Sequence, residues 1–517
     1  MECKRTPFEK RTENVGPALI VLQKNTTNIY MTKMSENKEQ YLKKRPSAAM
    51  SLMPLLVLVV LLTFVIRAFG SDSLAGASQI ALLAASAFCV LIGMWRLNVP
   101  WSSFEKAIVK NVSSVASAII ILLLIGALGG AWMLSGVVPT LIYYGMHIIH
   151  PDIFLVSSCV ICALVSVMTG SSWTTIATIG IALMGIGRAQ GFADGWIAGA
   201  IISGAYFGDK ISPLSDTTTL ASGSLGVALF DHIRYMVYTT VPSIVIALMV
   251  FAVAGLLCDT NTAQDIGTFA LALKSRFCIS PWLLLVPVLT GLLIARRVPP
   301  IITLFLSSLM AVVAALVFQA DALREIDPSM FKAAMRCLYD STQLATDDAT
   351  LAGLVGTRGM AGMMGTIWLI VCAMCFGGCM SAGGMVGGIT RLFIHMVHSR
   401  TSLVASTAAS GVMLNIAIAD QYLCILLTGN MFRDIYDREG YERKLLSRTT
   451  EDSVTVTSVL VPWNTCGMTQ STVLGVSTWT YLPYCVFNIL SPIMSVIVAA
   501  TGYRIVHRKP SVKDTSE

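Results

Sequence analysis

The stretch Gly204-Ala-Tyr-Phe-Gly-Asp-Lys-Ile-Ser-Pro-Leu-Ser-Asp-Thr-Thr218 places three ionisable side chains in an otherwise apolar region. Asp209, Lys210 and Asp216 are costly at membrane depth unless they pair or line a wet cavity. Pro213 removes a backbone donor and favours a broken helix. The carbonyls freed by such a break, together with carboxylates and hydroxyls, suit a hard cation such as sodium. The same residue types are common in exposed turns, so a surface loop remains the alternative.

The rest of the chain has the composition of a protein embedded in lipid. Of its 517 residues, 55% are hydrophobic and 13% are charged, and the mean hydropathy is +0.71. Soluble domains carry about 25% charged residues. The apolar stretches are long and continuous, which favours helices over the alternating strands of a barrel. We therefore predict an all-α polytopic membrane protein with about 10–12 membrane-crossing or half-crossing segments.

Charge and hydropathy divide the chain into five parts. The first, residues 1–46, holds ten Lys or Arg and five Glu and lacks an apolar core, so we expect a disordered basic cytoplasmic tail. The others are an N-terminal transmembrane repeat (47–258), linking loops and spans (259–360), a C-terminal transmembrane repeat (361–506) and a cytoplasmic tail (507–517). Because both ends are basic, both termini are expected in the cytoplasm, and the chain in the inner (cell) membrane.

A polar cluster precedes a broken apolar segment twice in the sequence. Thr169 opens the first cluster, and Ser212 follows 43 residues later; Asn415 opens the second, and Ser458 follows 43 residues later. The two halves are therefore offset by 246 residues. Broken segments in corresponding positions of two halves indicate a transporter's binding site. Chance placement of Gly and Pro kinks is the alternative.

Both halves supply candidate cation or proton ligands. In the first half these are Asp209, Asp216, Ser212, Thr217, Thr218, Thr169, Ser171, Ser172 and Thr174. In the second half they are Asn415, Asp420, Glu451, Asp452, Asn464 and Thr465. Hydroxyl side chains in membrane helices often bond to their own helix instead, which is the bland interpretation of the Thr169–Thr174 cluster.

The acidic candidates leave several roles open. Asp420 fits either an ion carrier or a helix end near water. Glu451 and Asp452 fit a helix cap, an ion pair with Arg448 or a place on the cation path, and capping is the favoured role. A carboxylate at Asp209 or Asp216 is the expected centre of the site.

Lys210 is the expected charge partner of that central carboxylate, whose ionised form it would favour. No metal site is expected beyond the transported Na+, because the 13 cysteines show no zinc-like or disulfide spacing. No cofactor and no nucleic-acid partner are expected.

Several motifs resemble the NhaC-type sodium/proton antiporter family. They are Gly204–Thr218, Ser447-Arg-Thr-Thr-Glu-Asp452, Leu460-Val-Pro-Trp-Asn-Thr-Cys-Gly467, Gly170-Ser-Ser-Trp-Thr174 and the glycines of Phe376–Met385. The resemblance covers nearly everything except the N-terminal tail. It implies two inverted repeats, each with a re-entrant hairpin and a broken helix that meet near mid-membrane.

Carried onto this sequence, the resemblance puts the hairpin tips at Thr169–Thr174 and Asn415–Asp420. It puts the breaks at Gly208–Thr218 and Pro462–Gly467. Thr219 departs from the family pattern, in which Asn is expected, and this puts ion selectivity in doubt.

The function implied is secondary active exchange of Na+ for H+ across the cytoplasmic membrane by alternating access, serving pH homeostasis. The partners implied are Na+, H+ and the lipid membrane, and a homodimer is common for this fold. Some members of the family exchange organic acids such as malate and lactate with Na+ and H+. A coupled organic-acid exchanger is therefore the alternative, and a channel is a weaker one.

An intramembrane aspartyl protease is a remote alternative, since Tyr206-Phe-Gly-Asp209 and Leu338-Tyr-Asp340 are similar to that family's two motifs. Such an enzyme needs two carboxylates that share a site. Here Tyr206 replaces the first glycine, Asp340 falls in a polar link expected at 319–358, and the order of the motifs is reversed. We therefore expect no enzyme.

Overall fold

The computed structural model describes residues 46–69, 76–258, 263–344, 356–505 and 507. Within these ranges the chain is helical apart from two isolated bridges. Eight of the described helices are long and apolar enough to cross a membrane, or up to ten if two bent pairs each count as one span. The prediction of an all-α multi-pass membrane protein is confirmed. Almost all of the two predicted tails lies outside the described residues.

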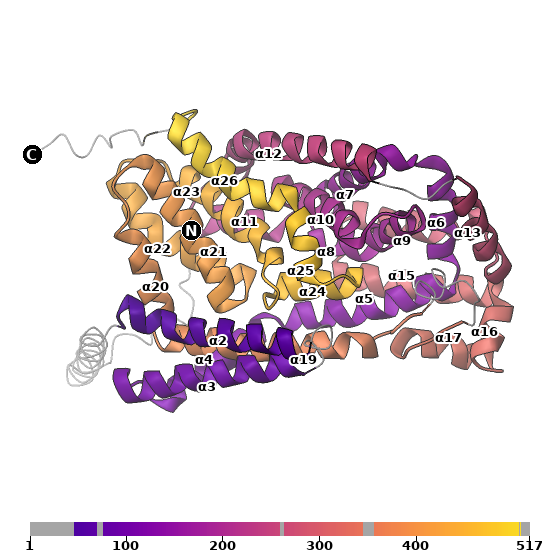
Figure 1. The fold of residues 1–517 in the computed structure, drawn as a ribbon, viewed down its shortest axis with the longest axis horizontal. Helices are drawn as coiled ribbons and strands as arrows, with labels where there is room; N and C mark the ends of the chain where they lie inside the picture. The colour runs from indigo at the N-terminus through magenta and orange to yellow at the C-terminus, as the bar shows by residue number, and fades with distance from the viewer. Residues whose placement is uncertain (1–45, 70–75, 259–262, 345–355, 506, 508–517) are drawn as a thin grey trace, which may run out of the picture.

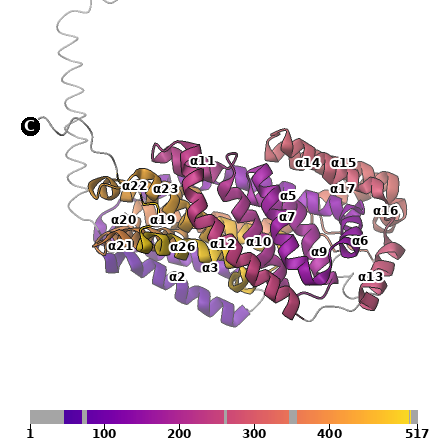
Figure 2. The same ribbon diagram turned by 90° about the horizontal axis from the view of Figure 1, so that it is seen from above.

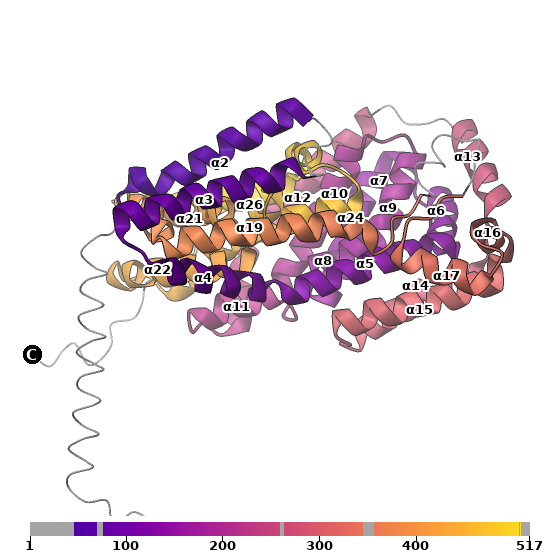
Figure 3. The same ribbon diagram turned by 90° about the horizontal axis from the view of Figure 1, so that it is seen from below.

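A layer of helices flanks the two halves that carry the polar motifs. It contains α2 (Ala48–Phe69), α3 (Ala77–Leu97), α4 (Trp101–Ser114), α5 (Ala116–Leu134) and, from much later in the chain, α19 (Met364–Ala382). The helices α2, α3 and α19 lie side by side (Figure 3), and α19 also packs on α4. The helices α2, α3 and α19 are strongly apolar, as membrane spans must be.

The expectation of a polar link at 319–358 is wrong in part, because this segment contains packed helices. These are α16 (Ala320–Ile326) and α17 (Met330–Tyr339), which follow α14 (Leu285–Ala295) and α15 (Pro300–Phe318). Figure 2 shows α14, α15 and α17 together at one edge. One face of α17 is apolar and buried through Ala333, Ala334 and Cys337, so the helix packs despite its low overall hydropathy.

The first half holds a helical hairpin followed by a broken helix. The hairpin consists of α7 (Phe154–Thr169), α8 (Ser172–Thr175), a π-helical turn (Ile176–Gly180) and α9 (Ile181–Ala189). The broken helix consists of α10 (Asp194–Ile211) and α11 (Asp216–Ser224), and the long α12 (Leu229–Leu257) follows. The break thus falls inside the predicted Gly208–Thr218 range, and the predicted hairpin tip is confirmed.

The second half repeats this order after α20 (Met385–Ile394). Its hairpin is α21 (Arg400–Ile418) and α22 (Gln421–Arg438). Its broken helix is α23 (Arg443–Thr450), a π-helical turn (Glu451–Thr455), a 3-10 turn (Ser458–Leu460) and α24 (Thr465–Leu474). The bent pair α25 (Thr478–Tyr481) and α26 (Val486–Thr501) closes the chain.

The boundaries of these elements recur 249 residues apart. Gly170 and Ala419 are both left-handed residues that end the first hairpin arm, with φ of 67° and 63°. Ser171 and Asp420 are the next residues, and each caps the second arm through its side chain. The expected offset of 246 residues is therefore corrected to 249 across the hairpin tips and the breaks.

Two tertiary hydrogen bonds repeat at the same register. Ser166 Oγ donates to a carbonyl of α10 at 2.6 Å, and Asn415 Nδ2 donates to the equivalent carbonyl of the second broken helix at 2.8 Å. Ser172 bonds Asp209, and the equivalent pair, Gln421 and Ser458, is also hydrogen-bonded. The two halves therefore repeat in contacts as well as in element order.

The two hairpins begin at opposite ends of α12. Near its end, Gly255 packs against the backbone of Asp152, just before α7. Near its start, the Tyr235 hydroxyl donates to the carbonyl of Arg504, just after α26, at 3.0 Å. The same end of α26 meets the start of α21, where Arg400 Nε donates to a carbonyl at 2.7 Å. In Figure 1, α21 and α22 accordingly lie at one end of the molecule and α7 and α9 toward the other.

Candidate ion-binding site between the two halves

Asp209 is the carboxylate at which the first hairpin meets the first broken helix. It lies in the last turn of α10 and is 6% exposed. Its Oδ2 accepts hydrogen bonds from the Ser172 backbone N–H at 3.2 Å and the Ser172 hydroxyl at 2.7 Å. Its Oδ1 accepts from the Ser215 hydroxyl at 2.6 Å. Three donors thus hold both oxygens of this buried carboxylate.

The glycines of the same motif allow α7 and α10 to approach closely. A Cβ at Gly204 would collide with the carbonyl oxygen of Cys159, and one at Gly208 would collide with that of Ala163. The close packing brings the hairpin tip to Asp209.

The break is a built element and not a surface loop. Asp209 and Lys210 are buried, and the Thr218 hydroxyl donates to the freed carbonyl of Lys210 at 3.0 Å. Ser212 donates from its hydroxyl to a carbonyl of α7 at 2.8 Å. Only the turn of Pro213 and Leu214 is exposed in the gap between α10 and α11. The predicted hydroxyls at 212 and 218 thus satisfy backbone carbonyls that the break leaves unpaired.

Two hydroxyl groups link Asp209 to a second buried carboxylate. The Ser215 and Thr217 hydroxyl oxygens lie 2.9 Å apart, and Thr217 donates to Glu451 Oε1 at 3.0 Å. Glu451 is fully buried in the π-helical turn of the second half. Such turns occur often at functional sites because the extra residue re-aims side chains. The arrangement brings one carboxylate from each half to a common set of oxygen atoms.

Lys210 forms its ion pair with Asp452 and not with its sequence neighbours Asp209 or Asp216. Both partners are fully buried, and the ammonium also donates to the Ser491 hydroxyl at 2.9 Å. The expected pairing of Lys210 with Asp209 or Asp216 is therefore wrong, because its partner comes from the second half. The first and second broken helices are joined by this ion pair.

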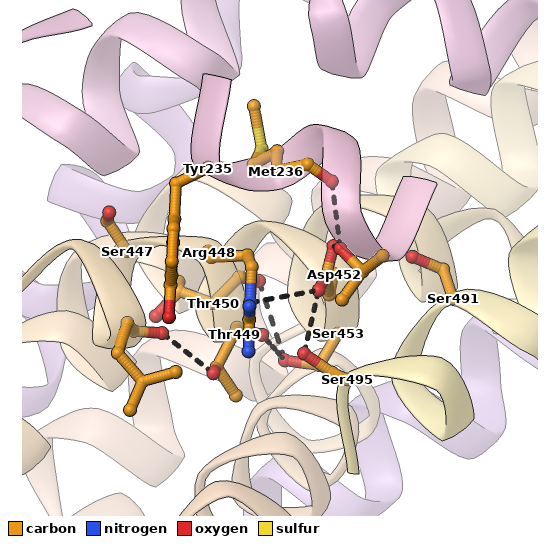
Figure 4. A network of polar contacts seen from close by, with 12 residues as sticks. Tyr235, Met236, Ser447, Arg448, Thr449, Thr450, Asp452, Ser453, Ser491 and Ser495 are labelled. Carbon is orange, nitrogen blue, oxygen red and sulfur yellow. Dashed lines mark hydrogen bonds and ion pairs between the residues drawn. The ribbon is translucent and has the colours of Figure 1, made fainter. Parts of the chain in front are cut away.

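Asp452 is shared between two cationic side chains, Lys210 and Arg448; Figure 4 shows its contact with Arg448. Arg448 Nε lies 3.9 Å from Asp452 Oδ2, and its guanidinium lies 4.6 Å from the ring centroid of Tyr235. Asp452 also accepts hydrogen bonds from Thr239 at 3.1 Å and Ser495 at 2.7 Å. Four groups from four helices, α10, α12, α23 and α26, thus hold one carboxylate of the π-helical turn.

The favoured capping role for Glu451 and Asp452 is wrong. Both residues follow α23 and lie in the π-helical turn, whereas Glu442 occupies the capping position before that helix. The alternative of an ion pair with Arg448 is confirmed for Asp452.

Other predicted hydroxyls of the first hairpin bond within it. The Thr169 hydroxyl donates to the Ser171 carbonyl at 3.2 Å, and the Ser171 hydroxyl accepts the Thr174 N–H at 3.2 Å. Asp216 lies exposed in the first turn of α11, and the described residues include no ion-pair partner for it. Of the two expected central carboxylates, only Asp209 is therefore enclosed.

The predicted residues of the second hairpin hold it to its broken helix. Asp420 is buried and accepts a backbone N–H of α22 at 2.8 Å. Asn464 donates to the Asn415 carbonyl at 3.2 Å, and the Thr465 N–H donates to the Ala419 carbonyl at 2.9 Å. These groups stabilise the contact between the second hairpin and the second broken helix. They make no hydrogen bond to Asp209 or Glu451 in the described part of the chain.

Sequence reasoning missed the hydroxyls that surround the ion pair, namely Thr239, Ser491 and Ser495. Ser491 and Ser495 are four residues apart in an apolar span, so they share one helix face. That spacing could have identified Ser491 and Ser495 as a polar face on an otherwise apolar helix.

Comparison with known proteins assigns the chain to a protein family. Residues 204–503 match the family described as the Na+/H+ antiporter family. The chain belongs to that family. It is 39% identical over 406 residues to a protein of Alkalihalophilus pseudofirmus named Na(+)/H(+) antiporter NhaC, covering 78% of this chain and 86% of the relative. The Bacillus subtilis protein of the same name is 36% identical, with 77% and 87% covered.

A third relative has a different printed activity. The Bacillus subtilis Malate-2H(+)/Na(+)-lactate antiporter is 35% identical over 433 residues, covering 83% of this chain and 91% of that protein. All three are antiporters, which makes this chain a transporter and not an enzyme. The remote protease alternative also lacks its paired carboxylates, since Asp340 pairs with Arg336 at 3.5 Å and Asp209 bonds Ser172 and Ser215.

Proposed function

We propose that this member of the family exchanges Na+ for H+ by alternating access, and that the two ions compete for Asp209 and Glu451. The observation that carries this proposal is the hydroxyl link from Asp209 through Ser215 and Thr217 to Glu451. Carboxylate and hydroxyl oxygens from both halves converge there, and such oxygens are the ligands that hard cations prefer.

The charges of the buried cluster support competition between the two ions. Asp209, Glu451 and Asp452 are acids, and Lys210 and Arg448 are bases, so the cluster carries one net negative charge when all five are ionised. Net charge is costly inside a membrane protein. A bound Na+ or a bound proton each neutralises the cluster, so protonation of one carboxylate releases the cation.

Within the cluster, Asp452 is already balanced by Lys210 and Arg448. Asp209 and Glu451 form no ion pair within the described residues, so these two are free to bind the transported ions. The hydroxyls of Ser172, Ser215 and Thr217 would replace part of the water shell of Na+. We assign no such ligand role to Asp216, which water can reach.

We infer that the two halves are inverted repeats and that alternating access moves their hairpins and broken helices against the flanking helices. The 249-residue register and the opposite starting ends of the two hairpins support this. Inverted repeats with broken helices form substrate sites near the bilayer midplane.

The orientation we propose places both termini in the cytoplasm and the chain in the inner membrane. In support, Pro46 at the start of α2 accepts a hydrogen bond from Arg391, and Arg400 bonds the end of α26, so both described ends share one side. That side carries basic residues, as cytoplasmic ends do. A homodimer remains a prediction.

Exchange of an organic acid together with Na+ and H+ is the second candidate. The malate and lactate relative supports it, because its identity to this chain is close to that of the two NhaC relatives. The same carboxylate site serves either function, since both need a coupled cation and proton.

The test uses purified protein in liposomes with a pH dye inside and an imposed proton gradient. Sodium, lithium, potassium, lactate and malate are added singly and then together. Dissipation by Na+ alone supports Na+/H+ exchange. Dissipation that requires an organic acid would replace it with the second candidate, and no dissipation under any condition would contradict both.

A further inference from the structure

A large cavity lies beside the second break, apart from the ion-binding cluster. Its volume is about 1330 Å³, and its walls come from α2, α3, α5, α9, α19 and α24. Trp463 of the second break lines it, whereas Asp209 and Glu451 do not. A cation path needs neither this volume nor an apolar wall.

The lining combines an apolar wall with one basic end. Leu62, Ile125 and Leu369 are among its many aliphatic residues, and two arginines, Arg188 and Arg358, also line it. Arg188 is neutralised by Asp194 through two hydrogen bonds of 2.8 and 3.0 Å. The Arg358 side chain is exposed and has no ion pair among the residues that the structure describes. Among the described lining residues, Arg358 is therefore the one arginine whose charge no ion pair offsets.

The apolar wall includes helices at the periphery of the molecule. In the most apolar stretches of α2 and α3, only 28% and 33% of the residues are buried. The remaining surface of these helices faces away from the protein, which is the surface that contacts lipid in a membrane protein. The cavity is therefore bounded in part by helices whose other faces contact lipid.

We propose that the cavity binds an anionic phospholipid, with its phosphate at Arg358 and its acyl chains along α2 and α5. Guanidinium groups bind phosphate with paired hydrogen bonds, and basic pockets between transmembrane helices are sites for anionic headgroups. The charge and the apolar wall fit such an amphiphile better than a small soluble anion.

The structure offers a variant that fills the cavity without a clash. Gly129 of α5 lines the cavity, and a Cβ there would meet nothing within 4 Å. Gly129→Leu therefore inserts a side chain into the space, and it also replaces a glycine that costs a helix roughly 0.5–1 kcal/mol. Gly291→Leu in α14 is the matched control, since its Cβ is equally free and it does not line the cavity.

The experiment is native mass spectrometry of the purified chain after equilibration with phosphatidylglycerol or with phosphatidylcholine. Inorganic phosphate and lactate are the soluble competitors. The wild type should retain phosphatidylglycerol about tenfold more than phosphatidylcholine, because the choline cation of the latter offsets the phosphate charge that attracts Arg358. Arg358→Gln should lose this preference, and the exposed control Arg296→Gln should keep it. Gly129→Leu should retain neither lipid, whereas Gly291→Leu should behave as wild type.

The proposal is overturned if Gly129→Leu retains phosphatidylglycerol as the wild type does, or if the wild type does not prefer it. It is also overturned if lactate or phosphate binds through Arg358 and excludes the lipid, which would make the cavity a soluble-anion site. Binding is measured without transport, so these results are independent of whether Na+/H+ exchange is found.

Discussion

The ion pair between Lys210 and Asp452 makes an asymmetric prediction about stability. Lys210→Met leaves Asp452 with Arg448 at 3.9 Å and two hydroxyl donors, Thr239 and Ser495. Asp452→Asn leaves two buried cations, Lys210 and Arg448, without the carboxylate that pairs with both. Removing one partner of a buried ion pair costs about 3–5 kcal/mol. We expect about 3 kcal/mol for Lys210→Met and about 5 kcal/mol or more for Asp452→Asn.

The double variant Lys210→Met, Asp452→Asn provides the control. It removes the ion pair completely and leaves only Arg448, which keeps its contact with the ring of Tyr235. Residues in direct contact couple by about 0.5–3 kcal/mol, so the double variant should cost about 2 kcal/mol less than the sum of the single variants. The measurement is the free energy of unfolding from denaturant titration in detergent micelles. An Asp452→Asn variant as stable as Lys210→Met would refute the reasoning, and so would simple additivity.

Three further predictions concern the first broken helix and the groups that contact it. Thr217→Val removes the hydroxyl between Ser215 and Glu451. It should weaken the apparent Na+ affinity about tenfold in a liposome exchange assay, while Thr217→Ser should preserve that affinity. Equal affinities in the two variants would exclude the hydroxyl link between Asp209 and Glu451. Gly204→Ala should lower the melting temperature because its Cβ meets a carbonyl of α7, whereas Gly223→Ala, whose Cβ meets nothing within 4 Å, should not; the reverse order would contradict the packing. Gly170→Ala combines a left-handed φ with a Cβ 2.6 Å from the backbone of Leu214 in the first break. Exchange should therefore fall while membrane insertion is kept. A fully active variant would argue against tight contact between the first hairpin tip and the first break.

Hydropathy predicted the apolar spans and Pro213 the first break, whereas the first hairpin tip was placed by the family resemblance. Continuous apolar runs predict spans, and Gly170 and Pro213 mark places where a helix cannot continue. The pairing of Lys210 with Asp452 could not be predicted, because it joins residues 242 positions apart and depends on the tertiary packing of the two broken helices.

The error in the repeat register has a local cause. The hairpin arm α21 has 19 residues and its counterpart α7 has 16. The expected offset of 246 paired Thr169 with Asn415, whereas the repeated hydrogen bonds pair Ser166 with Asn415 and so give 249. Glu451 was among the candidate ligands, but its link to Asp209 through Thr217 and Ser215 could not be predicted, since no pattern of polar residues marks a π-helical turn.

The central claim is that the transported ions compete at Asp209 and Glu451. The most direct measurement is 22Na+ exchange against a proton gradient in liposomes containing wild type, Asp209→Asn, Glu451→Gln or Asp216→Asn, with equal reconstituted protein in each. The account predicts that exchange is lost in Asp209→Asn and Glu451→Gln and retained in Asp216→Asn, whose carboxylate is exposed. Retained exchange in Asp209→Asn would contradict it.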